Sequence, residues 1–178
     1  MHTEKKLNSE VKYDGRIIKV YFDTVELENG MTATRDVVRH NGAACVAPVT
    51  DDGKLIFVRQ YRYPLGKELL ELPAGKLDSI NEDPYLCAVR ELKEETGCSA
   101  EKITYLGDFI STAGFCDENI RLYMAEGLDF GDMKLDDDEF LDVLQIPLEK
   151  AKEMVLSGEI IDGKTQALVL KVCAILGK

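Results

Sequence analysis

Histidine and paired cysteine are scarce in this sequence. It has two histidines and five cysteines, an odd number with irregular spacing and no Cys-x-x-Cys pair. These counts argue against a disulfide framework and against a zinc site built from thiolates or imidazoles.

Basic residues are outnumbered as well. The 22 Lys and Arg residues stand against 33 Asp and Glu, which gives a net charge of −11 and a pI of about 4.7. A chain this acidic does not bind nucleic acid or an anionic membrane through its general field. If its substrate is an anion, local arginines or bound cations must reverse that field.

Long apolar runs are also missing. No uninterrupted apolar stretch reaches the length of a membrane-spanning helix. The N-terminal segment MHTEKKLNSEVKYDG is too polar for a secretory signal. We therefore expect a cytoplasmic protein that does not enter a membrane.

What is present is the composition of a globular protein. The 178 residues are 45% hydrophobic and 31% charged, which suits one domain, or a compact domain with a small appendage. Turn signals at Glu28-Asn29-Gly30 and Asp51-Asp52-Gly53 predict hairpins. Apolar segments predict strands within residues 10–40, including 32–38, and at 43–49, 54–60, 68–72, 103–110, 120–125 and 140–146.

Three helices are predicted among these strands. The first begins at Asp83-Pro84, with Asp as N-cap, and runs to Thr96, where Gly97 ends it. A second opens at Pro147 and runs to about residue 157, and a third follows Asp162-Gly163 and runs through Leu176. Residues 126–138 are expected to form an acidic loop. Hairpins mixed with helices predict an antiparallel or mixed sheet flanked by helices, in the α/β (α+β) class.

An acidic cluster lies on the first predicted helix. Glu91, Glu94 and Glu95 are three and four residues apart, so they share one helix face and repel one another. No cation follows four residues downstream to relieve Glu95. A hard divalent ion would do so, and oxygen-only ligands favour Mg²⁺ or Mn²⁺. The alternative is a merely solvated helix face, since charge runs usually only solvate.

The spacing around this cluster favours the metal. Residues 90–98, RELKEETGC, fit the pattern REUxEExGU, and Glu82 precedes Arg90 by the required seven intervening residues. The stretch from Gly75 to Cys98 resembles the Nudix box, Gx5Ex7REUxEExGU. One departure is that six residues separate Gly75 from Glu82 where the family has five. Loop insertions cost little, so we expect the metal-binding face to survive.

The resemblance covers almost the whole chain. The segments that carry it are RQYR at residues 59–62, ELLELPAG at 68–75, RDVVRH at 35–40, DEF at 138–140 and DGKT at 162–165. Together they look like the ADP-ribose pyrophosphatase branch of Nudix hydrolases. A second departure is Ala113, where that branch commonly has a proline. The implied fold is a Nudix α/β/α sandwich with a mixed sheet and an N-terminal antiparallel β-hairpin arm.

The resemblance also implies roles for named residues. Glu91 and Glu95 would coordinate the catalytic metal ions with help from the Ala74 carbonyl, and Glu94 is a weaker candidate, acting directly or through water. Glu82 and Arg90 are expected to form a supporting ion pair. The base that activates water would be an acid on the loop beyond the box, for which Glu139 is favoured and Asp137 is the alternative.

Other side chains are predicted to bind the substrate. Arg35 and Arg62 suit phosphate or the adenine and ribose, because a guanidinium binds phosphate with two hydrogen bonds and stacks on rings. Glu71 is predicted to bind a ribose or an amine. His40 has no evident partner and is interpreted as structural. The division expected is an N-terminal β arm at 1–40, used for dimerisation, and a Nudix hydrolase domain at 41–178.

The predicted reaction is metal-dependent hydrolysis of ADP-ribose to AMP and ribose 5-phosphate by a homodimer. Three alternatives stay open. One is another Nudix substrate, such as GDP-mannose, a dinucleoside polyphosphate or an oxidised nucleotide. Another is a non-catalytic Nudix module that senses a nucleotide, although all the box glutamates are present. The last is a scaffold whose acidic helix binds a basic partner, which leaves the box spacing unexplained.

Overall fold

The computed structural model describes residues 2–135 and 140–178. Its strands are β1 (Lys5–Asp14), β2 (Ile18–Glu26), β3 (Thr32–His40), β4 (Ala43–Pro48), β5 (Lys54–Arg62), β6 (Lys67–Glu71), β7 (Ala74–Lys76), β8 (Cys98–Ile110), β9 (Asn119–Phe130) and β10 (Leu141–Pro147). Its helices are α1 (Pro84–Thr96), α2 (Leu148–Leu156) and α3 (Gly163–Ile175), with a short 3-10 turn at Tyr63–Leu65.

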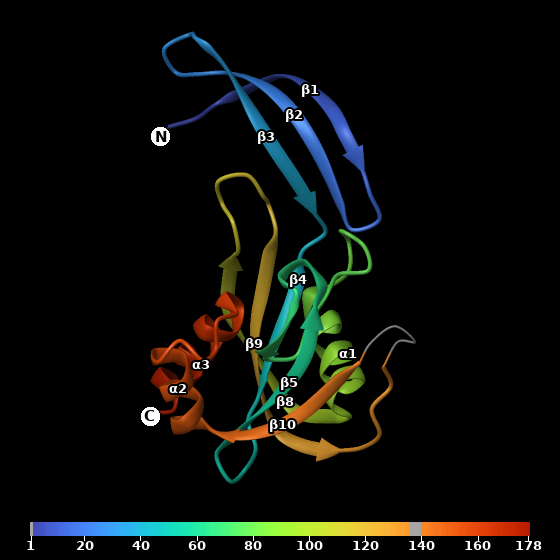
Figure 1. Ribbon diagram of the computed structural model, residues 1–178, viewed down its shortest axis with the longest axis vertical. Helices are drawn as coiled ribbons and strands as arrows, with labels where there is room; N and C mark the ends of the chain where they lie inside the picture. The colour runs from blue at the N-terminus through green and yellow to red at the C-terminus, as the bar shows by residue number, and fades with distance from the viewer. Residues whose placement is uncertain (1, 136–139) are drawn as a thin grey trace.

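The body of the molecule has helices on both sides of its sheets (Figure 1). One sheet has the order β7-β4-β9-β8 and the other the order β10-β5-β6. Strands β4 and β9 run parallel, whereas the other pairs are antiparallel. The α/β/α sandwich with a mixed sheet is therefore confirmed.

Strand β4 shows why the body has this layering. All of its residues are buried, so it is covered on both faces. Ala43, Cys45 and Ala47 belong to the apolar cluster that includes α2 and α3. Ala44 and Val46 belong to the cluster that includes α1. Because successive side chains of a strand point to opposite faces, this short apolar segment packs against the helices on both sides of the sheet.

The predicted helix ends agree with the structure. Asp83 caps α1 by accepting the Tyr85 N–H at 2.9 Å, and Gly97 ends it with φ of 71°. A Cβ at Gly97 would also lie 2.3 Å from the Gly131 carbonyl oxygen, so the close approach of the following chain requires glycine there. None of the helices in the described part of the chain has both the length and the apolar character of a membrane crossing.

The acidic loop expected at 126–138 is wrong in its first part. Strand β9 continues to Phe130, which pairs with Cys98 at the start of β8. Lys102 and Glu126 face each other across this pair at 2.8 Å. The charges that suggested a loop are therefore partly neutralised across neighbouring strands, a contact that cannot be read from a local window of sequence.

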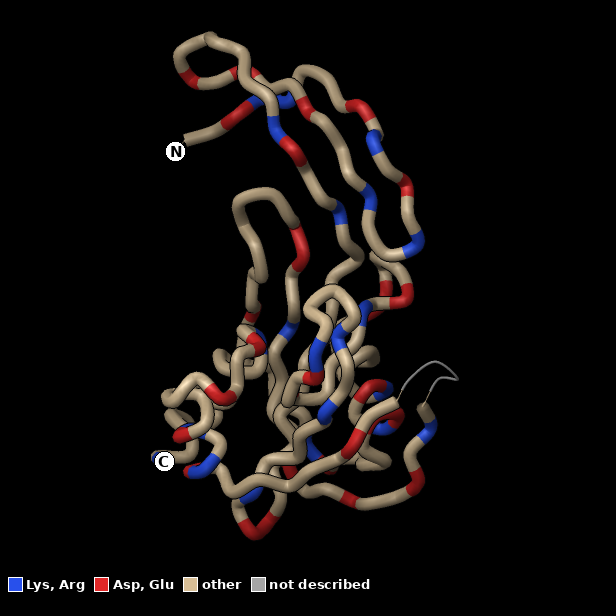
Figure 2. The backbone as a smooth tube through the Cα atoms, viewed as in Figure 1, with Lys and Arg blue, Asp and Glu red and all other residues tan. Residues whose placement is uncertain are grey.

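The N-terminal arm is a three-stranded sheet of order β1-β2-β3, rather than a hairpin alone. Strand β1 escaped prediction because its side chains are all exposed and mostly polar. The arm extends from the body with charges of both signs along its strands (Figures 1 and 2). It is joined to the body where Val38 N–H donates to Phe115 O and Asp117 N–H donates to Val38 O.

Candidate active site

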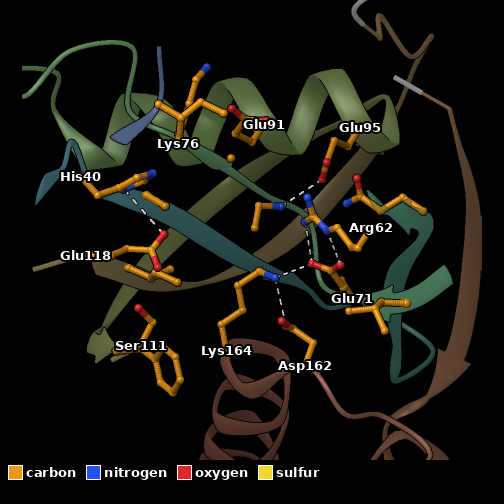
Figure 3. Close-up of a pocket in the computed structure, with 18 of the residues that line it drawn as sticks. His40, Arg62, Glu71, Lys76, Glu91, Glu95, Ser111, Glu118, Asp162 and Lys164 are labelled. Carbon is orange, nitrogen blue, oxygen red and sulfur yellow. Dashed lines mark hydrogen bonds and ion pairs between the residues drawn. The ribbon is translucent and has the colours of Figure 1, made fainter. Parts of the chain in front are cut away.

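A cavity of about 910 Å³ opens on the body, and Arg16 and His40 from the arm are among its lining residues. This volume lies in the range of small-molecule sites in proteins. Its wall combines α1, the strands β5 to β7 and the start of α3, as Figure 3 shows. Three groups of charged side chains line it, and each comes from a different part of the chain.

The first group is the acidic face of α1. Glu91 and Glu95 are buried and line the cavity together with Glu94. Their spacing brings the carboxylates to one side of the helix, as the sequence predicts. The Ala74 N–H donates to Glu95 Oε2 at 3.0 Å, which ties this face to the start of β7.

Gly75 allows that face to approach β7. A Cβ at this position would lie 2.0 Å from Glu91 Oε1 and 2.1 Å from its carboxyl carbon. Any larger residue would push the carboxylate aside. The first glycine of the box is thus required by the space that Glu91 occupies, which gives a physical reason for a motif position.

Arg90 is surrounded by carboxylates. Its Nη1 lies 2.5 Å from Glu91 Oε1 and 3.2 Å from Glu94 Oε2, and its Nη2 lies 3.4 Å from Glu82 Oε1. Burial alone would lower the pKa of Arg90, but the neighbouring acids, led by Glu91, raise it. The predicted pair of Glu82 with Arg90 is confirmed, and Arg90 also neutralises part of the acidic face.

The extra residue between Gly75 and Glu82 is absorbed by the turn before α1. Glu82 N–H donates to Ser79 O at 3.1 Å, and Asp78 N–H donates to Glu82 Oε2 at 2.5 Å. The turn returns Glu82 to Arg90 despite the insertion. The expectation that the helix face survives is therefore supported by its geometry.

The donor set of this group fits a hard divalent cation. Among residues 2–135 and 140–178, no three acidic, histidine or cysteine side chains converge as a complete cage. Mg²⁺ does not need one, because it is usually held by one or two carboxylates together with substrate phosphates and water. Glu91 and Glu95 supply such carboxylates beside a large cavity.

The second group lies opposite, between β5, β6 and α3 (Figure 3). Glu71 accepts two hydrogen bonds from Arg62, at 2.7 Å to Nε and 2.7 Å to Nη2. Lys164 also contacts Glu71, and its Nζ lies 3.0 Å from Asp162 Oδ2. Burial would raise the pKa of Glu71, but Arg62 and Lys164 outweigh burial and hold that pKa at about 2. The carboxylate is therefore ionised at neutral pH.

The third group lies near the junction with the arm. His40 Nδ1 lies 3.6 Å from Glu118 Oε1 and accepts the Gly42 N–H at 3.0 Å. The neighbouring Asp117 accepts the His40 backbone N–H at 2.9 Å. His40 and Glu118 both line the cavity. The sequence offered no evident partner for His40, and the structure places Glu118 and Asp117 beside it.

The predicted site residues fall into three classes. Ala74, Glu91, Glu94 and Glu95 lie together on one side of the cavity, and Arg62 and Glu71 lie on the other. Arg35 lies in the arm, where its Nε donates to Glu4 at 3.0 Å, and the cavity wall described for this chain does not include it. Glu139 and its alternative Asp137 lie outside the described residues.

Sequence reasoning missed several residues that line the cavity. They are Arg16, His40, Glu118, Asp162 and Lys164. The last two belong to the segment DGKT, which carried the resemblance but received no role. No periodicity or charge pattern could have paired them with Glu71, because 93 residues separate Lys164 from its partner. The segment DGKT was visible in the sequence, but the contact of Lys164 with Glu71 depends on the fold.

The layers and the cavity define a class of protein: an α/β/α sandwich whose helix α1 presents paired carboxylates to a large cavity. Residues 38–165 match the NUDIX domain family. The chain belongs to the Nudix family, and the resemblance seen in the sequence is confirmed.

Two relatives match most of the chain. They are a methanol dehydrogenase activator from Bacillus methanolicus and an ADP-ribose pyrophosphatase from Bacillus subtilis (strain 168). Each is 43% identical over 164 residues, which cover 91% of this chain and 88% of the relative. A crystal structure of an ADP compounds hydrolase, 23% identical, has a TM-score of 0.88 and covers 99% of this chain and 96% of its own. That likeness establishes the fold.

Proposed function

We propose that this protein hydrolyses the pyrophosphate bond of ADP-ribose to give AMP and ribose 5-phosphate. The observation that carries the proposal is a single cavity with paired carboxylates of α1 on one side and the cations Arg62 and Lys164 on the other. A relative of 43% identity is an ADP-ribose pyrophosphatase. Such a cavity can hold a diphosphate between bound cations and fixed basic side chains.

Glu91 and Glu95 would hold the divalent ion, Mg²⁺ or Mn²⁺, together with the Ala74 carbonyl. Such an ion, when bound, neutralises charge on the diphosphate and polarises phosphorus. The protein's own contribution is to keep both carboxylates buried and oriented. Ala74 N–H holds Glu95, and Arg90 holds Glu91.

The hydrolysis needs a base for its water. Water oxygen bonds to one phosphorus, the bridging P–O bond breaks, and the water proton passes to a carboxylate. We propose Glu139 for this role, with Glu94 assisting from α1. Glu139 lies outside the described residues, and the resemblance to the ADP-ribose pyrophosphatase branch is what supports this choice.

Arg62 is proposed to bind the substrate phosphates. The prediction for Glu71 changes from a direct substrate contact to support of Arg62. Its side chain is 1% exposed, and its oxygens accept from Arg62 and Lys164. A carboxylate in that position repels a phosphate unless the cations beside it turn their remaining donors toward the cavity.

The arm at 1–40 is proposed to join two copies of the chain, with Arg35 serving the partner's cavity. No helix covers the arm sheet in Figure 1, and apolar side chains on it are exposed, among them Leu7, Val11, Tyr13 and Phe22. A small sheet of this kind gains stability by packing on another surface. Sedimentation of the full chain tests the dimer, and mixing Arg35→Ala with Glu95→Gln subunits tests shared sites.

A nucleotide panel tests the substrate. Purified protein with Mg²⁺ is given ADP-ribose, GDP-mannose, a dinucleoside polyphosphate and an oxidised nucleotide, and the products are separated chromatographically. ADP-ribose should give AMP and ribose 5-phosphate with the highest kcat/KM. Faster turnover of GDP-mannose would overturn the substrate assignment, and binding without turnover of any of them would favour a nucleotide sensor.

A further inference from the structure

Two neighbouring residues at the start of α3 bind two neighbouring residues at the end of β6, one through an ion pair and the other through a hydrogen bond. Lys164 Nζ contacts the Glu71 carboxylate, and Thr165 Oγ1 accepts the Leu72 N–H at 2.9 Å. Thr165 is fully buried. The same turn is ordered by Asp162, which accepts the Thr165 N–H at 3.0 Å. The start of α3 is therefore attached to the strand end at two adjacent points.

The charged part of this contact is shielded from water. Glu71 is 1% exposed and the Lys164 side chain is 11% exposed. Burial of Lys164 by itself would lower its pKa, but Glu71 and Asp162 together raise it, so the ammonium stays charged. Two cations, Arg62 and Lys164, share the one carboxylate of Glu71 (Figure 3). Removing one partner of such an ion pair leaves the other charge buried and unpaired, which lowers the stability of the fold.

The contact fixes the orientation of Arg62. Its Nε and Nη2 both donate to Glu71 in the two-pronged geometry of a guanidinium and a carboxylate. Neither of these two bonds uses Nη1, and Arg62 lines the cavity, so we assign the Nη1 N–H groups as the donors to a ligand there. The direction of Nη1 depends on where the Glu71 carboxylate is held, and Lys164 holds it from the side of α3.

The same strand end leads to the carboxylates of α1. After Leu72 the chain continues to Ala74, whose N–H donates to Glu95 Oε2. Pro73 O accepts the Val46 N–H at 2.9 Å, which fixes the intervening residue on β4. Because Lys164 contacts Glu71 directly and this anchor lies between Glu71 and Ala74, we expect a change at Lys164 to affect Arg62 more than Glu95.

We propose that Lys164 is a positioning residue for substrate binding: through the buried carboxylate of Glu71 it aims the Arg62 guanidinium at the substrate phosphates. The inference rests on the proposed function, because it takes the diphosphate as the ligand of Arg62. Lys164 acts through Glu71 and not by contact with the reacting atoms. Its loss should therefore raise KM and leave kcat nearly unchanged.

Kinetics of Lys164→Met test the proposal, with Lys171→Met as the matched control. Lys171 is an exposed lysine seven residues further along the same helix. KM for ADP-ribose with Mg²⁺ should rise about tenfold in Lys164→Met, with kcat within about twofold of the original protein. Lys164→Arg keeps a charged donor and should restore most of the affinity. Lys171→Met should behave like the original protein.

A double-mutant cycle separates positioning from a purely structural role. If Lys164 acts through Arg62, the double variant Arg62→Met/Lys164→Met should have the same KM as Arg62→Met alone. Losses that multiply would show that Lys164 works independently of Arg62 and would overturn the proposal. A fall in the melting temperature with unchanged KM would overturn it too.

A spectroscopic measurement keeps the test independent of turnover. The ¹⁵Nε–H signal of Arg62, assigned by its absence in Arg62→Met, should report a rigid side chain in the original protein and a mobile one in Lys164→Met. If Lys164→Met does not fold, Lys164→Gln, which retains an uncharged donor, replaces it in both measurements. An equally rigid Arg62 signal in the variant contradicts the inference.

The two proposals fail differently. An original protein that does not hydrolyse ADP-ribose refutes the proposed substrate, while the Arg62 signal still decides the role of Lys164. An original protein that hydrolyses ADP-ribose, with unchanged KM and an unchanged Arg62 signal in Lys164→Met, refutes only the positioning role.

Discussion

The two charged sides of the cavity differ in their ratio of carboxylates to cations. On the α1 side, the Arg90 guanidinium contacts the carboxylates of Glu82, Glu91 and Glu94, and Glu95 lines the cavity beside them. On the α3 side, the cations Arg62 and Lys164 face the carboxylates of Glu71 and Asp162.

This difference in balance implies different functions. An excess of negative charge at a cavity is costly unless a cation offsets it, which supports the metal site proposed on the α1 side. The α3 side needs nothing from solvent, and its closed network of ion pairs instead holds an arginine in a fixed direction. Under the two proposals, the α1 side would hold the metal ion and the α3 side would orient a basic side chain.

Removing one carboxylate from the α1 side should have the largest effect. We expect Glu95→Gln to lower kcat by about 100-fold or more, since one metal ligand is lost, while the fold is retained. Steady-state kinetics with Mg²⁺ and circular dichroism measure the two properties. Glu153→Gln on α2, an exposed residue, is the control. Near-original kcat in Glu95→Gln would refute the metal assignment.

Adding Mg²⁺ should raise the melting temperature of the protein through carboxylates of the α1 side and not through the α3 side. Binding to the folded state at about 100 times Kd contributes about 2.7 kcal/mol, which for a domain of this size raises the melting temperature by about 5 °C or more. The rise should persist in Lys164→Met and shrink strongly in Glu91→Gln. A thermal shift series against magnesium concentration measures it. Equal melting-temperature shifts in the two variants would show that the two sides of the cavity do not differ in metal binding. No shift in the original protein would favour an acidic scaffold.

Gly75→Ala should damage the α1 side through shape rather than charge. The new Cβ would meet Glu91 Oε1 at 2.0 Å, so the carboxylate must move. We expect a loss of stability of about 1–3 kcal/mol and weaker metal binding. Urea unfolding and a magnesium titration of activity measure these effects. Gly114→Ala is the matched control, because a Cβ there meets nothing within 4 Å. Unchanged magnesium dependence would contradict this account of the box glycine.

The ion pairs of the α3 side should make the free energy of unfolding depend on pH in the acid range. The pKa of Glu71 is depressed from 4.5 to about 2, so its ion pairs stabilise the fold above pH 4.5, and that stability is lost as the pH falls toward 2. Within this window the unfolded chain binds one more proton, worth about 1.4 kcal/mol per pH unit.

Urea unfolding between pH 5 and 3 measures this slope. Glu71→Gln should be less stable at neutral pH and should lose stability less steeply in acid than the original protein does. Glu153→Gln should keep the original slope. Identical slopes in Glu71→Gln and the original protein would show that Glu71 titrates normally.

Much of the fold follows from local residue patterns. Asp83, Pro84 and Gly97 mark both ends of α1 because capping and left-handed backbone are properties of single residues. The three acids of α1 share a face because helical spacing alone decides it. By contrast, the end of β9 and the whole of β1 were missed, since charged residues in exposed strands resemble loops until the partner strand is known.

The sequence by itself determined the family, the acidic face of α1 and the ion pair of Glu82 with Arg90, because each depends on residues within one box and one helical turn or two. Only the tertiary structure decided that Gly75 must lack a side chain, that His40 meets Glu118, and that Lys164 meets Glu71. These contacts join residues from separate elements. Their geometry depends on how the sheets and α3 pack, and no local pattern encodes it.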